Sequence, residues 1–211
     1  MKVIDLENWN RREHFEFFSK YDNPFFGIVT EIDCTVAYEF AKKNEISFFG
    51  YYLFKSIQAI NAVDELRLRV IDKNVVMFDK IHASSTIGRS DGTFGFSFIK
   101  FSTDAMKFNN DLQKEIQRVQ QTNGLNLNEN DKRLDVVHYS TLPWNKFTGL
   151  SHARNFNTDD TVPKITFGKI FMVGDKKMMP MSIDVHHGLV DGLHIANYLE
   201  EFQKLMDSNK F

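Results

Sequence analysis

The segment that most constrains the fold is an apparent strand that runs into an apparent helix near the C-terminus. Apolar side chains occupy every second position of residues 178–187, which predicts a β-strand with His187 on its apolar face. Asp191 and Gly192 follow, and Asp is a favoured residue for capping the N-terminus of a helix. A chain that ends this way is expected to contain both a sheet and helices packed against it.

The rest of the chain mixes helical and strand patterns without a regular βαβ rhythm. This favours an α+β fold, a two-layer sandwich of helices on a mixed β-sheet, formed by a single domain over residues 1–211. The patterns predict helices at 8–20, 36–43, 50–63 and 104–121, strands at 28–32, 94–101, 136–140 and 164–172, and a hairpin of 66–71 with 74–78.

Composition excludes several classes of protein. A net charge of −2 argues against a nucleic-acid partner. The charged N-terminus is unlike a signal peptide, and no run of ~18 apolar residues predicts a membrane span, so we expect a cytoplasmic protein. Cys34 is the only cysteine, which rules out an intramolecular disulfide, and the seven histidines lack metal-ligand spacing, so we expect no metal.

His187 is the first candidate for chemistry. Histidine is the side chain best suited to take and return a proton near neutral pH, and a strand end is a common location for reactive groups. The alternative is a histidine with a purely structural role, which is also how we interpret His186, expected on the opposite face of the strand. Asp191 likewise has the simpler role of a helix cap. The sequence contains no Gly-x-Ser-x-Gly elbow of serine hydrolases, no phosphate-binding loop and no dinucleotide-binding fingerprint.

Four blocks of the sequence resemble the chloramphenicol acetyltransferase family, in order along nearly the whole chain. Residues 186–192 are similar to its His-His-x-x-x-Asp-Gly signature, and Trp9–Phe15 to its N-terminal Trp-x-Arg-Lys-Glu-His-Phe. Leu142–Thr148 and Thr166–Lys169 are similar to its Pro-Trp and Thr-Met-Gly-Lys blocks. The His-x-x-x-Asp-Gly core alone is shared with the acyltransferases of 2-oxo acid dehydrogenases, so the order of all four blocks carries the resemblance.

The resemblance implies an acyltransferase that moves an acetyl group from acetyl-CoA, a co-substrate and not a tightly bound cofactor, to a hydroxyl of chloramphenicol. It implies antibiotic resistance as the role and a homotrimer with active sites at subunit interfaces as the assembly. In this family pattern His187 is the general base, and Asp191 is held by Arg11 in an ion pair. Thr166 corresponds to a threonine that holds a water in the transition-state complex.

The resemblance also implies contacts to both substrates. Lys169, with Lys55 as a second candidate, falls where the family places lysines near the CoA phosphates. We align the family's oxyanion serine with Gly149, so Thr148 or a backbone N–H is expected to take its place. Phe26 aligns with a drug-contacting tyrosine and lacks its hydroxyl.

The chain has 21 phenylalanines, and some are expected to line an apolar acceptor pocket. The candidates are Phe25, Phe26, Phe94 and Phe96, whose alternative is ordinary core packing. Two other functions stay open: an acetyltransferase for a different hydroxylated small molecule, and a non-catalytic trimer that binds an antibiotic or CoA. Gly149 and Phe26 differ from the family pattern on the acceptor side of the site. The sequence therefore supports acetyl transfer more strongly than it supports chloramphenicol as the acceptor.

Overall fold

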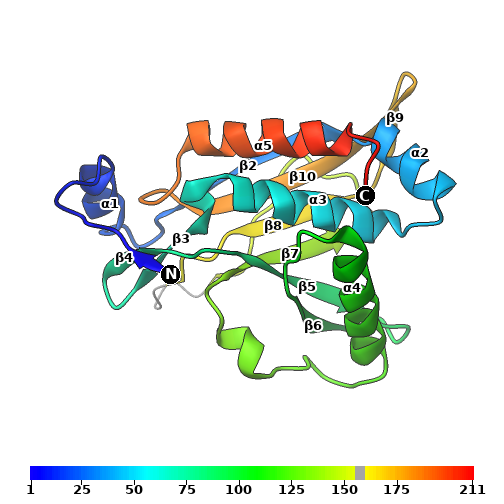
Figure 1. Cartoon of the computed structure of the whole chain (residues 1–211), viewed down its shortest axis with the longest axis horizontal. Coiled ribbons are helices and arrows are strands. Elements are labelled where there is room, and N and C mark those ends of the chain that lie inside the picture. Colours follow the sequence, from blue (N-terminus) through cyan, green and yellow to red (C-terminus); the bar gives the residue numbers. More distant parts are fainter. Residues whose placement is uncertain (155–159) are drawn as a thin grey trace.

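A computed structural model describes residues 1–154 and 160–211, and its centre is a mixed seven-stranded sheet (Figure 1). Neighbouring strands run antiparallel except that β5, β7 and β8 are parallel to one another. The sheet confirms the predicted α+β class. Its strand order is β2 (Phe25–Asp33), β10 (Lys176–His186), β8 (Lys164–Gly168), β7 (Val136–Leu142), β5 (His82–Gly88) and β6 (Phe94–Ile99), with β9 (Phe171–Val173) paired to β10.

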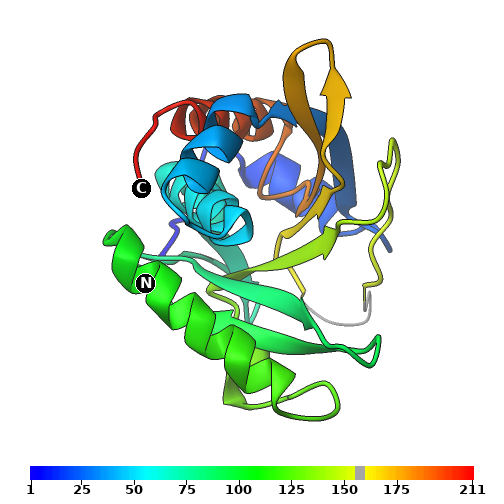
Figure 2. The ribbon, with the colours of Figure 1, turned by 90° about the vertical axis from the view of Figure 1, so that its right-hand side faces the viewer.

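Helices form a second layer on one face of this sheet (Figure 2). The buried helix α3 (Phe48–Ala62) packs against α5 (Gly192–Met206), while α4 (Ala105–Gln120) packs on β6. The hydroxyl of Ser56 in α3 hydrogen-bonds those of Tyr139 in β7, at 3.0 Å, and Tyr198 in α5, at 2.8 Å. These bonds tie three elements together inside an otherwise apolar core.

The remaining elements lie around the sandwich. Helix α1 (Arg12–Phe18) lies beyond one end of the sheet, and α2 (Thr35–Lys43) packs on α3. A small sheet has the order β1 (Lys2–Val3), β4 (Asn74–Met77), β3 (Leu68–Ile71). The predicted hairpin is confirmed, because Asp72 and Lys73 both adopt positive φ angles, as a two-residue turn of twisted strands requires.

Several predicted boundaries are wrong. The strand predicted over 164–172 is two strands, since β8 ends at Gly168, where a Cβ would lie 2.6 Å from Pro180 and 2.8 Å from Phe147. Strand β5 was not predicted, because its Ser84, Ser85 and Thr86 are small polar residues without an apolar alternation. The N-terminal helix is shorter than 8–20 and covers only seven residues.

Cys34 is fully buried just before α2, and burial raises the pKa of its thiol. Within the described residues, no helix is long and apolar enough to cross a membrane.

Candidate active site

His187 lies in the turn directly after β10, because the strand predicted over 178–187 ends one residue earlier, at His186. Its backbone N–H donates to the carbonyl of Pro24 at 2.8 Å, which ties the turn to the start of β2. The imidazole stacks on Phe18 of α1, with ring centroids 4.0 Å apart and planes within 10°, and Phe26 of β2 lies at 4.3 Å. Two aromatic rings from separate elements therefore fix the orientation of the imidazole.

The Arg11–Asp191 ion pair that the resemblance implies is present beside this turn. One Arg11 Nη donates to the carboxylate of Asp191, and the other donates to the backbone carbonyl of His187 at 3.2 Å. Asp191 also caps α5, accepting from the N–H of Leu193 at 3.0 Å. Its partial burial opposes ionisation, but the bond from Arg11 and the charges of His194 and Arg11 outweigh burial and lower the pKa of Asp191.

His186 is buried in the last position of β10. Its Nδ1 accepts from the N–H of Gly188 at 3.2 Å, and its ring meets Phe25 edge-on at 5.4 Å. Burial, together with the nearby charge of Arg154, lowers the pKa of His186 to about 4. A neutral, hydrogen-bonded imidazole of this kind supports the turn, which fits the structural role expected for His186.

A pair of adjoining cavities lies along the middle and far strands of the sheet, and His187 is not among the described residues that line them. The larger, of about 820 Å³, is lined by α3, β5 and the loop after β7, and Trp144 and Lys169 are among its walls. The smaller, of about 430 Å³, is lined by strands β5 to β8 and the segment around His152. Ser140 and Thr86 line both cavities, so the two meet at these hydroxyls.

Thr166 is buried in β8 and belongs to the smaller cavity. The strand register places it opposite Ser140 of β7 on one side and Ser182 of β10 on the other. Its hydroxyl oxygen lies 2.9 Å from Nε2 of His152. The smaller cavity is therefore more polar than the phenylalanine content of the sequence suggests.

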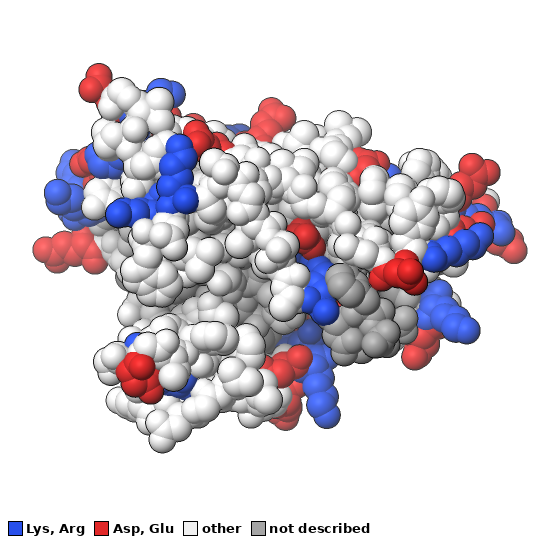
Figure 3. Space-filling view, turned by 180° about the vertical axis from the view of Figure 1, so that it is seen from behind, with Lys and Arg blue, Asp and Glu red and all other residues white. Residues whose placement is uncertain are grey.

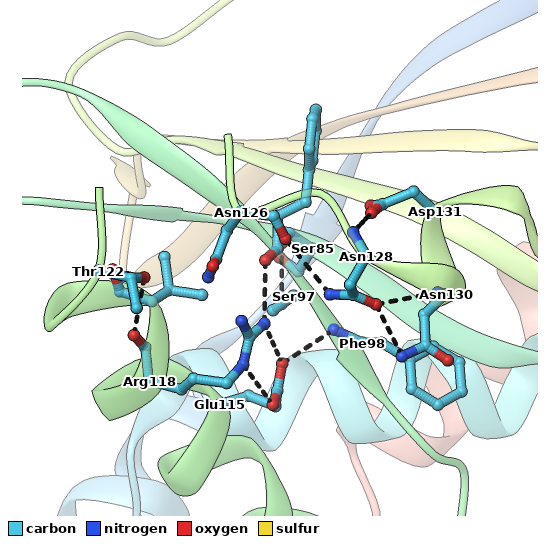
Figure 4. A network of polar contacts seen from close by, with 12 residues as sticks. Ser85, Ser97, Phe98, Glu115, Arg118, Thr122, Asn126, Asn128, Asn130 and Asp131 are labelled. Carbon is cyan, nitrogen blue, oxygen red and sulfur yellow. Dashed lines mark hydrogen bonds and ion pairs between the residues drawn. The ribbon is translucent and has the colours of Figure 1, made fainter. Parts of the chain in front are cut away.

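The outer wall of the smaller cavity is supported by a polar network on α4 (Figure 4). Glu115 and Arg118 form an ion pair at 2.8 Å. Glu115 accepts from the backbone N–H of Phe98, while Arg118 donates to the carbonyl of Phe96. These contacts satisfy backbone groups at the edge of β6 and hold Phe96 against the cavity.

The predicted pocket residues are divided between the two regions. Phe26 contacts His187, while Phe25 packs against His186 and under the guanidinium of Arg154. Phe94 lines the larger cavity and Phe96 the smaller one. Within one chain, the four phenylalanines therefore do not form the single pocket that we expected.

Three other predicted residues lie outside the cavities. Lys55 is buried in α3 against Tyr51 and Phe54, and is not among the described residues that line either cavity. Thr148 and Gly149 are exposed in the loop after β7 and are likewise absent from both linings.

Sequence reasoning missed Phe18 and Ser140. Phe18 falls three residues beyond the N-terminal block, so that block could have suggested it. Ser140 precedes the Leu142–Pro143–Trp144 run by two residues, and only the pairing of β7 with β8 brings it opposite Thr166. That pairing is parallel and joins distant segments, so it leaves no local signal.

Comparisons with known proteins show similarity over nearly the whole chain. The sequence model described as chloramphenicol acetyltransferase matches residues 1–203. Chloramphenicol acetyltransferase 3 of Escherichia coli is 29% identical over 97% of this chain and 96% of its own, and the Campylobacter coli enzyme is 27% identical over 97% of both.

Solved structures show the same relationship. A chloramphenicol acetyltransferase structure superposes with a TM-score of 0.91 at 27% identity, covering 97% of this chain and 99% of its own. A probable dihydrolipoamide acetyltransferase from Listeria monocytogenes has a TM-score of 0.67 at 14% identity, covering 100% of this chain and 96% of its own, which shows a shared fold. With a family match over nearly its full length, the chain belongs to the chloramphenicol acetyltransferase family of enzymes.

Proposed function

We propose that this protein transfers the acetyl group of acetyl-CoA to a hydroxyl of chloramphenicol and so inactivates the antibiotic. The observation that carries the proposal is the environment of His187, whose ring is stacked on Phe18 and whose turn is held by Arg11. A family enzyme that retains this environment has the general base that the reaction needs. Dependence on acetyl-CoA also fits the cytoplasmic location expected from the sequence.

In the proposed reaction His187 removes the proton of the acceptor hydroxyl. The oxygen attacks the thioester carbonyl and forms a tetrahedral oxyanion, which collapses to the acetyl ester and releases CoA thiolate. The protonated imidazole returns its proton to the sulfur. General base catalysis of this kind contributes roughly 10²–10⁴ in rate.

The two cavities suggest how the substrates divide. The larger cavity is lined by Lys169 at its exposed side, which suits the phosphates and pantetheine arm of CoA. The smaller cavity, with Thr166, suits the acceptor. The thioester would then lie where the cavities meet, and the hydroxyl of Ser140 is better placed there than Thr148 to donate to the oxyanion.

A second copy of the chain completes the site in this proposal. His187 is not among the described residues that line either cavity, so the base and the substrates come together only if another subunit supplies one of them. The face opposite α3 and α5 has a recess, and much of its surface is uncharged (Figure 3). A homotrimer with closed threefold symmetry would bury such faces and form three equivalent sites.

A different hydroxylated acceptor is the second candidate. The smaller cavity is lined by Ser84, His138 and His152, so its wall offers several hydrogen-bonding groups. A non-catalytic trimer that binds an antibiotic or CoA is a weaker alternative, because binding alone does not require the supported base at His187.

The decisive experiment measures thiol release from acetyl-CoA with and without chloramphenicol. We expect drug-dependent release that falls by ~10²-fold or more in His187→Ala. His14→Ala, which removes an exposed histidine of α1, is the matched control. Release with another acceptor but not with chloramphenicol would favour the second candidate, and unchanged release in His187→Ala would refute the role of the base. Light scattering of the purified protein tests the trimer.

A further inference from the structure

One hydrogen bond in the smaller cavity has no role in the proposed reaction. The hydroxyl of Thr166 and Nε2 of His152 lie 2.9 Å apart, and both residues line the cavity. Thr166 is 2% exposed and sits in the middle of β8. Its hydroxyl is therefore held in place by the sheet, and the orientation of its hydrogen depends on its partner.

The segment that carries His152 is anchored to the sheet. The side chain of Arg154 is 3% exposed, and its Nε and one Nη donate to Asp184 of β10 at 2.9 and 2.6 Å. Its guanidinium also stacks over the ring of Phe25 at 3.5 Å. This buried ion pair holds His152 against Thr166, so the contact belongs to an anchored part of the loop.

The protonation of His152 can be inferred from its surroundings. Burial lowers the pKa of His152, and the charges of Arg154 and Lys164 lower it further against the opposing effect of Asp184. The ring is therefore neutral at pH 7 and carries one proton. Nδ1 is buried and has no hydrogen-bond partner among the described residues. A buried N–H without a partner is rarer in proteins than an unused acceptor, which favours the proton on Nε2.

A proton on Nε2 fixes the direction of the bond to Thr166. His152 donates and Thr166 Oγ1 accepts, so the hydroxyl hydrogen of Thr166 is free to donate into the cavity. We propose that His152 is a specificity-determining residue that turns Thr166 into a hydrogen-bond donor for the acceptor. This inference rests on the proposed function. The pair then selects acceptors that place an oxygen against it, such as a nitro, carbonyl or hydroxyl oxygen.

Steady-state kinetics with a set of variants tests the pair. We expect His152→Leu to raise KM for chloramphenicol by about five- to tenfold, the effect of one neutral hydrogen bond, and to leave KM for acetyl-CoA unchanged. His152→Gln, whose amide can still donate to Thr166, should stay within about twofold of the parent enzyme. His152→Leu combined with Thr166→Val should be no worse than Thr166→Val alone, because the two residues act as one unit.

The kinetic outcomes that would overturn the proposal are equally specific. Equal losses in His152→Leu and His152→Gln, or additive losses in the double variant, would show that His152 acts only through packing. Ser151→Ala, an exposed neighbour in the same loop, controls for disturbance of the segment. Thermal unfolding and acetyl-CoA binding of each variant identify any that fail to fold.

A measurement on the free protein separates this inference from the proposed function. Nitrogen-15 NMR of the histidine rings reports which nitrogen of His152 carries the proton. We expect the Nε2–H form, with ring shifts that change in Thr166→Val. The Nδ1–H form would overturn the inference even if chloramphenicol is acetylated. If the Nε2–H form is found in a protein that does not acetylate chloramphenicol, chloramphenicol is refuted as the acceptor. The inferred hydrogen bond from His152 to Thr166 would still hold.

Discussion

The turn around His187 and the cavities between β5 and β8 are built in opposite ways. At the turn, α1, β2, β10 and α5 converge, and each contributes a contact that fixes a side chain. At the cavities, the side chains of four neighbouring strands leave about 820 and 430 Å³ unfilled. The first region holds the proposed base, while the second has room for a substrate and His187 is not among the described residues that line it.

In the proposed trimer, this difference would correspond to a division of labour between copies of the chain. A base must be held rigidly, because small errors of position are costly in rate, and rigidity comes from dense packing. A substrate site must stay open until its ligand arrives. A single chain can meet both demands in separate places, and the closed symmetry of the proposed trimer would bring the two regions together.

The largest expected effect comes from mixing two inactive variants. His187→Ala removes the base, and Ser140→Phe fills the point where the cavities meet. If each site uses the base of one subunit and the cavities of the next, random trimers from an equal mixture should regain about one quarter of parental activity. Thiol release after denaturing and refolding the mixture measures this recovery.

Each variant refolded alone serves as the control and should stay inactive. No recovery in mixed oligomers, confirmed by mass spectrometry to contain both chains, would mean that one chain supplies its own base. The two regions would then have to approach each other within a subunit, which the sheet that separates them opposes.

A smaller effect is expected from the ion pair that supports the turn. The side chains of Arg11 and Asp191 are 9% and 33% exposed. Arg11→Ala should lower the free energy of unfolding by roughly 2 kcal/mol, because the half-buried carboxylate of Asp191 loses its charged partner. It should also reduce kcat more than either KM, because the carbonyl of His187 loses its donor. Urea unfolding and steady-state kinetics measure the two effects, and a loss of stability without a loss of kcat would make the pair purely structural.

Acid pH should remove the difference between Arg11→Ala and the parent protein. The pKa of Asp191 is lowered in the folded state, whereas an unfolded Asp has a pKa of about 3.9. The pair therefore adds its full stability above about pH 4 and loses it as pH falls through the folded-state pKa. Urea unfolding at pH 7 and at progressively lower pH should show curves that converge only in acid. A gap that persists well below pH 4 would mean that Arg11 stabilises the fold without the Asp191 charge.

The turn was more predictable from sequence than the cavities. The Arg11–Asp191 pair was implied by two blocks that resemble the family. The strand that leads to His187 was predicted from its own alternation of apolar residues. The helix cap at Asp191 follows from local chemistry alone. What sequence could not give was the exact end of β10, which places His187 in the turn instead of the strand.

The cavities depend on pairings that have no local signature. Strand β5 lacks an apolar alternation, yet its parallel pairing with β7 creates one wall of both cavities. His152 lies in a loop with no strong pattern, and the ion pair of Arg154 with Asp184, a residue distant in sequence, anchors that loop beside Thr166. Gly149 suggested a missing hydroxyl, while Ser140 of the paired strand places a hydroxyl where the cavities meet.

The smallest expected effect distinguishes the two lysines predicted to bind CoA. Lys169 is exposed beside the larger cavity, whereas Lys55 is 4% exposed in α3, where burial and the charge of Lys210 lower its pKa. Lys169→Met should raise KM for acetyl-CoA by about three- to fivefold at low salt, and less at high salt, because one exposed ion pair contributes under ~1 kcal/mol. Lys55→Met should change that KM by less than about twofold and act on the free energy of unfolding instead. A larger effect from Lys55 would mean that CoA, or a second subunit, reaches α3 by a route outside the larger cavity.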